Sequence, residues 1–185
     1  MPGFRLRIPD DELSRWASRY SYPGEGEIEK RVAPTARARG YLIRDEFLEL
    51  CRWKTPRSQP RCAENRGDFV REVSRIALAA TDEELKIRVL LLLAGVSWPT
   101  ASVILHFCDH GRYPILDFRA LWSVGFRRLP PYTFPLWWGY TCFVRDISDR
   151  TGLPMRTIDR ALWQYSKERQ GAAPRARSLR RPPAP

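Results

Sequence analysis

The sequence has few lysines and no long apolar run. Only four of its 32 basic residues are lysines, which leaves 28 arginines. The longest uncharged apolar run, Val89 to Trp98, covers ten residues and includes Gly95 and Ser97, so it is too short to span a bilayer. The N-terminal stretch has no apolar segment ahead of its acidic residues, which argues against a secretory signal. We therefore expect a cytoplasmic protein that does not span a membrane.

Cysteine and histidine are also scarce. The cysteines lie far apart, at Cys51, Cys62, Cys108 and Cys142. Without a CxxC pair they do not match the ligand spacing of zinc or iron–sulfur sites. His106 and His110 stand four residues apart, but Gly111 is expected to end their helix and to leave them without a third ligand. We predict reduced core thiols, no metal and no cofactor.

Positive charge is what the sequence has in excess. Its 185 residues carry 32 Lys and Arg against 21 Asp and Glu, which gives a net charge of +11 and a pI near 10.1. This balance is typical of proteins that bind a polyanion, and nucleic acid is the first candidate. The preference for arginine over lysine can also reflect genomic base composition. The length and the 43% share of hydrophobic residues fit one globular domain.

Helical periodicity dominates the chain, and no hairpin or alternating strand pattern is present. We predict an all-α domain over residues 1–170 and a flexible basic tail over residues 171–185, which is proline-rich and lacks acidic residues. The expected helices are Asp10–Tyr20, Glu25–Arg39 with an interruption at Pro34, Ile43–Trp53, Asn65–Ala79, Asp82–Leu93, Pro99–Cys108, Asp117–Val124, Phe134–Arg150 and Pro154–Gln170. The stretch Lys54–Glu64, with two prolines, is expected to be a loop.

The stretch from Leu90 to Gly125 carries the most chemical information. Within it, residues 94–97 leave little chain to reverse direction between two helices, and Gly95 can adopt the positive φ that such a turn requires. The backbone amides from Val96 to Ala101 are then expected to point outward at the start of the second helix, where the helix dipole favours phosphate. A DNA backbone can dock there without any base being read.

These residues resemble the helix-hairpin-helix DNA glycosylase superfamily, which has an endonuclease III-like base-excision fold. Its hairpin typically reads L-P-G-V-G-x-K-T-A, and an aspartate follows in a V-D-T-H-like stretch. The matching residues here are Leu93, Gly95, Val96, Thr100 and Ala101, followed by Ile115 to Arg119. Asp117 lies 18 residues after Pro99, which occupies the family's lysine position, and this spacing is similar to that of the family. The resemblance covers 36 of the 185 residues.

The chain departs from the family pattern at three positions. Ala94 replaces the usual proline and Ser97 the second glycine, although Ser97 can itself cap the following helix. Pro99 stands where bifunctional members carry their lysine nucleophile. The resemblance therefore implies a monofunctional glycosylase that removes a base and leaves an abasic site in an intact strand, unless another lysine or the N-terminus reaches the sugar.

Asp117 is the catalytic residue that the resemblance implies. Cleaving a base from deoxyribose builds positive charge on the sugar, and a nearby carboxylate stabilises that charge. It can also align or deprotonate the attacking water. The alternative is that Asp117 caps the helix it begins, a role that aspartate often fills. The two roles can coexist.

The remaining site predictions concern DNA. Contacts to its backbone are expected from Gly95, Val96, Ser97, Trp98, Thr100 and Ala101. A base flipped out of the duplex needs a pocket, for which Trp53 and Lys54 at a helix–loop junction and Tyr113 are the candidates. Core packing is the alternative for each aromatic. The base itself stays open among alkylated purines, uracil, oxidised guanine and phage-type modified pyrimidines.

A second DNA-binding pattern lies between Ser148 and Leu162. It resembles a helix-turn-helix, with a glycine turn and a basic helix that carries Arg156 and Arg160, although a packed closing helix explains its apolar face more simply. The alternative function is therefore a non-catalytic helix-hairpin-helix or helix-turn-helix protein that grips double-stranded DNA. Under either hypothesis we expect a monomer.

Overall fold

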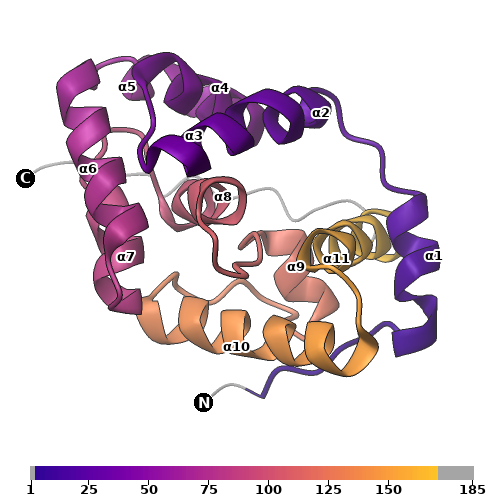
Figure 1. Cartoon of the computed structure of the whole chain (residues 1–185). Coiled ribbons are helices and arrows are strands. Elements are labelled where there is room, and N and C mark those ends of the chain that lie inside the picture. Colours follow the sequence, from indigo (N-terminus) through magenta and orange to yellow (C-terminus); the bar gives the residue numbers. More distant parts are fainter. Residues whose placement is uncertain (1–2, 171–185) are drawn as a thin grey trace, which may run out of the picture.

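Helices account for all the regular structure of residues 3–170, which are the residues that the computed structural model describes (Figure 1). The α-helices are α1 (Leu13–Ser18), α2 (Glu25–Glu27), α3 (Ala33–Arg39), α4 (Arg44–Lys54), α5 (Gln59–Cys62), α6 (Gly67–Ala79), α7 (Glu83–Leu90), α8 (Trp98–Cys108), α9 (Phe118–Ser123), α10 (Phe134–Thr151) and α11 (Met155–Arg169). Two 3-10 turns, η1 (Asp10–Glu12) and η3 (Pro56–Ser58), and a π-helical turn, η2 (Ile28–Val32), complete the set. The predicted tail, residues 171–185, lies outside the described residues. Within the described range, no helix combines the length and the apolar character that crossing a membrane requires.

The helices fall into two groups that meet at α8. Helices α2 to α7 lie on one side, whereas α1, α9, α10 and α11 lie on the other (Figure 1). α1 reaches the second group because it packs against α11, and Arg5 N donates to Val124 O at 2.9 Å just ahead of it. Every residue of α8 from Thr100 to Cys108 is buried, as expected for a helix with apolar residues on every face.

Pro34 does not interrupt the helical segment as expected. The chain passes from α2 through the π-helical turn η2 directly into α3, and Pro34 occupies the first turn of α3. The π-helical turn just ahead of it changes the hydrogen-bond ladder at the point where the proline lacks an N–H. The wider turn ahead of it keeps the segment helical.

The predicted loop Lys54–Glu64 contains two short helices, η3 and α5. Pro56 and Pro60 each sit in the first turn of one of them, again the position that accepts proline. Asn65 does not cap α6, because Arg66 occupies the N-cap position. The Asn65 side chain instead pairs with the backbone of Ala94, accepting from its N at 2.9 Å and donating to its O at 2.9 Å.

The apolar face of α6 was only partly predicted. Val73 and Ala77 are buried as expected, but Phe69 and Ile76 remain 44% and 41% exposed. Three of the four cysteines are buried free thiols, whereas Cys142 is exposed, so the prediction of core thiols was wrong for Cys142.

α7 is shorter than predicted at both ends. Asp82 is its N-cap and accepts from Leu85 N at 2.7 Å, so no capping box from Thr81 is needed. The helix ends at Leu90 because the next three residues bend, each donating to the carbonyl three positions earlier. α8, α10 and α11 begin and end within a residue or so of their predicted limits.

A candidate active site between α4, α9 and α11

A pocket opens where the end of α4 faces α9 and α11. It contains about 470 Å³ of empty space, part of it continuous with solvent. Its lining residues come from four separate segments and are Tyr20, Tyr22, Trp53, Lys54, Ile115, Asp117, Ala120, Arg156, Asp159 and Trp163. Of the predicted pocket residues, Trp53 and Lys54 therefore line it together with Asp117, whereas Tyr113 does not.

Asp117 is both an N-cap and a pocket residue. Its Oδ1 accepts a hydrogen bond from Arg119 N at 2.8 Å, which caps α9. Its Oδ2 lies 2.7 Å from Lys54 Nζ, and 15% of the Asp117 side chain is exposed. The oxygen that contacts Lys54 is therefore not the one that caps α9.

Lys54 reaches Asp117 because α4 ends at Lys54. Thr55 leaves the helix with φ of −140°, as expected for a residue that precedes a proline. The ammonium therefore stands at a helix C-terminus, where the helix dipole favours a cation. Nearby, Thr55 Oγ1 lies 3.3 Å from Thr100 Oγ1, which links the end of α4 to the start of α8.

Four aromatic rings form one wall of the pocket. Tyr22 makes edge-to-face contacts with Trp53 and Trp163, with ring centroids 5.5 Å and 5.7 Å apart, and Tyr20 contacts Trp163 in the same way at 5.3 Å. Sequence reasoning missed Tyr20, Tyr22 and Trp163. Nothing local marks them, because they follow α1 or lie on α11 and meet Trp53 only in the folded chain.

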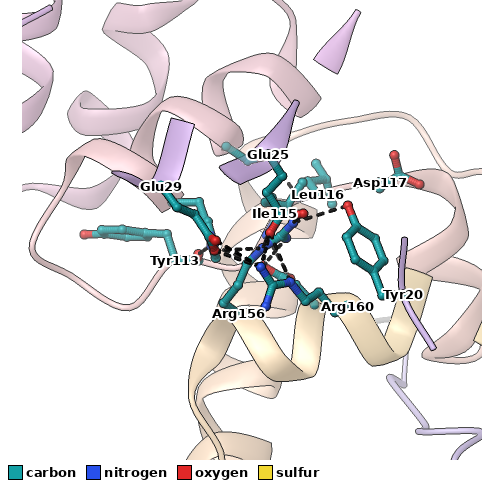
Figure 2. Close-up of polar contacts among 12 residues, drawn as sticks. Tyr20, Glu25, Glu29, Tyr113, Ile115, Leu116, Asp117, Arg156 and Arg160 are labelled. Carbon is teal, nitrogen blue, oxygen red and sulfur yellow. Dashed lines mark hydrogen bonds and ion pairs between the residues drawn. The ribbon is translucent and has the colours of Figure 1, made fainter. Parts of the chain in front are cut away.

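The segment that leads to Asp117, labelled from Ile115 to Asp117 in Figure 2, is fixed by side chains from three helices. Asp159 of α11 accepts from Ile115 N at 3.1 Å, and Tyr140 of α10 donates to Ile115 O at 3.3 Å. Ser102 of α8 accepts from Leu116 N at 2.8 Å. Because backbone groups on both sides of Ile115 are held, the carboxyl group of Asp117 has a defined place at the rim of the pocket.

Two of the groups behind this segment are buried titratable residues. Burial raises the pKa of Asp159 to about 7, although Arg156 opposes the shift. Burial lowers the pKa of His106 to about 3. Neutral His106 therefore donates from Nδ1 to Tyr113 O at 2.6 Å, and the same nitrogen lies 3.1 Å from Asp159 Oδ2. A histidine paired in this way holds the backbone at Tyr113 and contacts the side chain of Asp159.

Two basic residues of α11, Arg156 and Arg160, are paired with the protein's own carboxylates. Arg156 Nη2 lies 2.7 Å from Glu25 Oε2, and Arg160 Nη2 lies 3.0 Å from Glu29 Oε1 (Figure 2). Although burial opposes the shift, hydrogen bonds from both arginines lower the pKa of Glu25 to about 2. Arg156 and Arg160, the basic residues of the helix-turn-helix interpretation, are thus paired with Glu25 and Glu29.

The turn between α7 and α8 offers backbone donors to a ligand. Gly95 has φ of +79°, the conformation expected from the sequence. The amides of Gly95, Ser97 and Trp98 have no acceptor within residues 3–170. The amide of Thr100 has none either, but this residue is fully buried and out of reach of a ligand. Ser58, Arg61 and residues 91–97 line a groove along this turn, so a cationic side chain stands beside the free amides.

The other residues predicted for this turn have different roles. Val96 N donates to Leu93 O at 3.0 Å and Ala101 N to Ser97 O at 2.8 Å, so neither amide is free. Ser97 holds the N-cap position of α8 without a side-chain cap. Trp98 is half-buried, with Arg88 over its ring at 5.9 Å.

Tyr113 faces a different part of the core. It is buried and stacks on Trp137 with ring centroids 5.8 Å apart, and its hydroxyl donates to Glu83 Oε2 at 2.7 Å. Tyr113, predicted to line the base pocket, therefore does not line this one, because its ring and hydroxyl are engaged by Trp137 and Glu83. Core packing, the alternative weighed for each aromatic, applies to this one.

No family model, curated protein or solved structure matches the chain, and its own residues are therefore the guide to its chemistry.

Proposed function

We propose that the protein is a DNA glycosylase, which hydrolyses the N-glycosidic bond of an altered base that has been flipped out of double-stranded DNA. One observation carries the proposal. Asp117 stands at the rim of a pocket with an aromatic wall, and one of its carboxylate oxygens contacts Lys54. Transfer of a glycosyl group needs a carboxylate beside the sugar and a place for the leaving group, and the pocket offers both.

The pocket suits a flat, polar leaving group such as a nucleobase. The rings of Tyr22, Trp53 and Trp163 present faces and edges on which a base can stack. Arg156 and Asp159 also line the pocket and provide polar groups for the edge of the base. Burial keeps much of Asp159 protonated near neutral pH, with a pKa of about 7, so its carboxyl group can donate as well as accept a hydrogen bond.

Asp117 would act on the sugar rather than on the base. As the base leaves, positive charge develops at C1′, and the Asp117 carboxylate stabilises it across the opening of the pocket. The same carboxylate can align the water that attacks C1′ and can take its proton. The position of this group is defined because the hydrogen bonds to Ile115 and Leu116 fix the chain just ahead of it.

The α7–α8 turn would hold the DNA backbone near the pocket. Its free amides and Arg61 can contact a phosphate without reading a base. The contact between Thr55 and Thr100 joins the turn to the end of α4. A phosphate bound at the turn would therefore stand at a fixed place relative to Lys54 and Asp117.

The decisive experiment is a panel of DNA duplexes, each with one altered base, incubated with the protein and then treated with alkali to cleave abasic sites. We expect at least one duplex to be cleaved by wild type. Asp117→Asn should lose this activity while it still binds the duplex. If the protein binds DNA and releases none of the bases, the non-catalytic alternative replaces this proposal.

A further inference from the structure

Lys54 differs from the other lysines of the chain in its position. All four lysines lie within the described residues; Lys30 and Lys167 are exposed, and Lys86 is buried in an ion pair with Asp109. Lys54 alone among them lines the pocket beside Asp117. The side chain of Lys54 is 11% exposed. Its amine is therefore largely shielded from bulk solvent but accessible to a ligand in the pocket.

The ammonium of Lys54 retains donors that the protein does not use. It makes one hydrogen bond within residues 3–170, to Asp117 Oδ2 at 2.7 Å, and a lysine ammonium has three N–H donors. Because Lys54 lines the pocket, the remaining donors are available to a ligand there. A primary amine with a carboxylate at hydrogen-bond distance, in a concave site, has the parts needed for covalent chemistry with a carbonyl group.

We propose that Lys54 gives this pocket a second activity, the cleavage of DNA strands at abasic sites through a Schiff base. The inference rests on the proposed function, because it assumes that the same pocket receives a deoxyribose. It does not depend on which base is removed. It also replaces the expectation, based on Pro99, that the protein leaves the strand intact. The nucleophilic amine would come from Lys54 at the end of α4 and not from the position that Pro99 occupies.

The reaction balances with the groups present. Lys54 transfers one proton to Asp117, and its amine then adds to the C1′ aldehyde of the ring-opened abasic sugar. The carbinolamine takes up that proton and loses water, which leaves a C1′=N bond to Lys54. Asp117 next removes a proton from C2′, the C3′–O bond breaks, and the 3′ phosphate leaves with the bonding electrons. Hydrolysis of the C=N bond then regenerates the Lys54 amine.

A duplex with one preformed abasic site, incubated with full-length protein and sodium borohydride, tests this proposal. Hydride reduction of the C=N bond should produce a stable covalent adduct between protein and DNA. Lys54→Arg keeps a cation for Asp117 but cannot form an imine, so we expect the adduct to fall at least a hundredfold. Lys86→Arg alters the other buried pair and should leave the adduct at the wild-type level, where it remains folded. An adduct that persists in folded Lys54→Arg would overturn the proposal.

Mapping the adduct in the wild-type protein keeps the test independent of any variant. Proteolysis and mass spectrometry should place the reduced sugar on Lys54, and finding it on another lysine or on the N-terminal amine would overturn the assignment. The experiments also distinguish failure of the Schiff-base proposal from failure of the proposed base removal. Base release from the altered-base panel without any trapped adduct overturns the Schiff base alone, whereas an adduct on Lys54 without base release overturns base removal alone.

Discussion

The protein contains two Lys–Asp pairs of nearly the same geometry, in different surroundings. Lys54 Nζ lies 2.7 Å from Asp117 Oδ2, and Lys86 Nζ lies 2.6 Å from Asp109 Oδ2. In each pair the other aspartate oxygen accepts from the backbone N–H two residues later, at 2.8 Å from Arg119 and 2.6 Å from Gly111. The local bonding of the two aspartates is therefore almost interchangeable.

The two pairs differ in whether a ligand can reach them. The Lys86–Asp109 pair is about 8% exposed on each side, and the ring of Tyr113 lies 5.9 Å from Lys86 Nζ. The Lys54–Asp117 pair borders a pocket with room for a ligand. The comparison shows that an ion pair gains a chemical role from the space beside it, and each pair serves as the control for the other.

The largest expected difference concerns catalysis. Asp117→Asn should lower base release by about a hundredfold or more, because it removes the charge that stabilises the sugar while the shape is kept. Asp109→Asn makes the same chemical change in the other pair and should leave the rate of base release within a few-fold of wild type. Single-turnover assays at saturating protein, with circular dichroism to confirm folding, compare the two. Equal losses in both folded variants would remove the catalytic role from Asp117.

Local signals in the sequence predicted one part of this site well. The cap at Asp117, the positive φ of Gly95 and the end of the helix before Pro56 each depend on a few neighbouring residues. Such features are set by backbone sterics and by the orphan amides of helix ends. They place Asp117 and Lys54 at element boundaries before any tertiary structure is known.

The rest of the pocket depends on contacts that no local pattern contains. Tyr20 and Trp163 meet because α1 packs on α11, far from it in the sequence. Asn65 has the composition of a helix cap, but its side chain binds Ala94 in the α7–α8 turn. The pairing of Lys54 with Asp117 was also missed, because two charged residues 63 positions apart give no signal in a single sequence.

The second prediction concerns stability, for which the Lys86–Asp109 pair should matter more than the Lys54–Asp117 pair. Lys86→Met leaves Asp109 buried without its partner and should lower the free energy of unfolding by roughly 3–5 kcal/mol. Lys54→Met should lower it less, by about 1–3 kcal/mol, since water in the pocket can hydrate Asp117. Urea denaturation of both variants gives the comparison. If Lys54→Met is the more damaging change, the Lys54–Asp117 pair is primarily structural.

A third buried aspartate, Asp159, has no lysine partner and extends the comparison to pH. Burial raises its pKa from 3.8 to about 7, so between these values the folded protein holds a proton that the unfolded chain has lost. Its contribution to stability therefore declines as the pH rises from about 4 to about 7. Burial lowers the pKa of His106 from 6.5 to about 3, so the unfolded chain gains a proton below about pH 6.5 and stability falls as the pH is lowered.

Asp159→Asn separates these opposing effects. The amide oxygen can still accept from Ile115 N, but the titration of Asp159 is gone. The stability of the variant relative to wild type should therefore increase steadily as the pH rises from about 4 to about 7. Unfolding free energies of both proteins at several pH values within this window give the test. Parallel profiles would show that Asp159 ionises in the folded protein as it does in the unfolded chain.

The smallest expected effect is on DNA affinity, and it distinguishes DNA binding from catalysis. Arg61 lines the groove beside the free amides of the α7–α8 turn, so Arg61→Ala should lower affinity for undamaged duplex DNA only a few-fold and make the salt dependence shallower by about one phosphate contact. Arg15 on α1 is also exposed, and Arg15→Ala is the matched control for the loss of one charge.

Asp117→Asn and Asp109→Asn should keep the wild-type salt slope, since neither aspartate contacts a phosphate. Fluorescence anisotropy across a salt series measures all four variants, and equal slopes for Arg61→Ala and Arg15→Ala would mean that the turn is not where the DNA backbone is held.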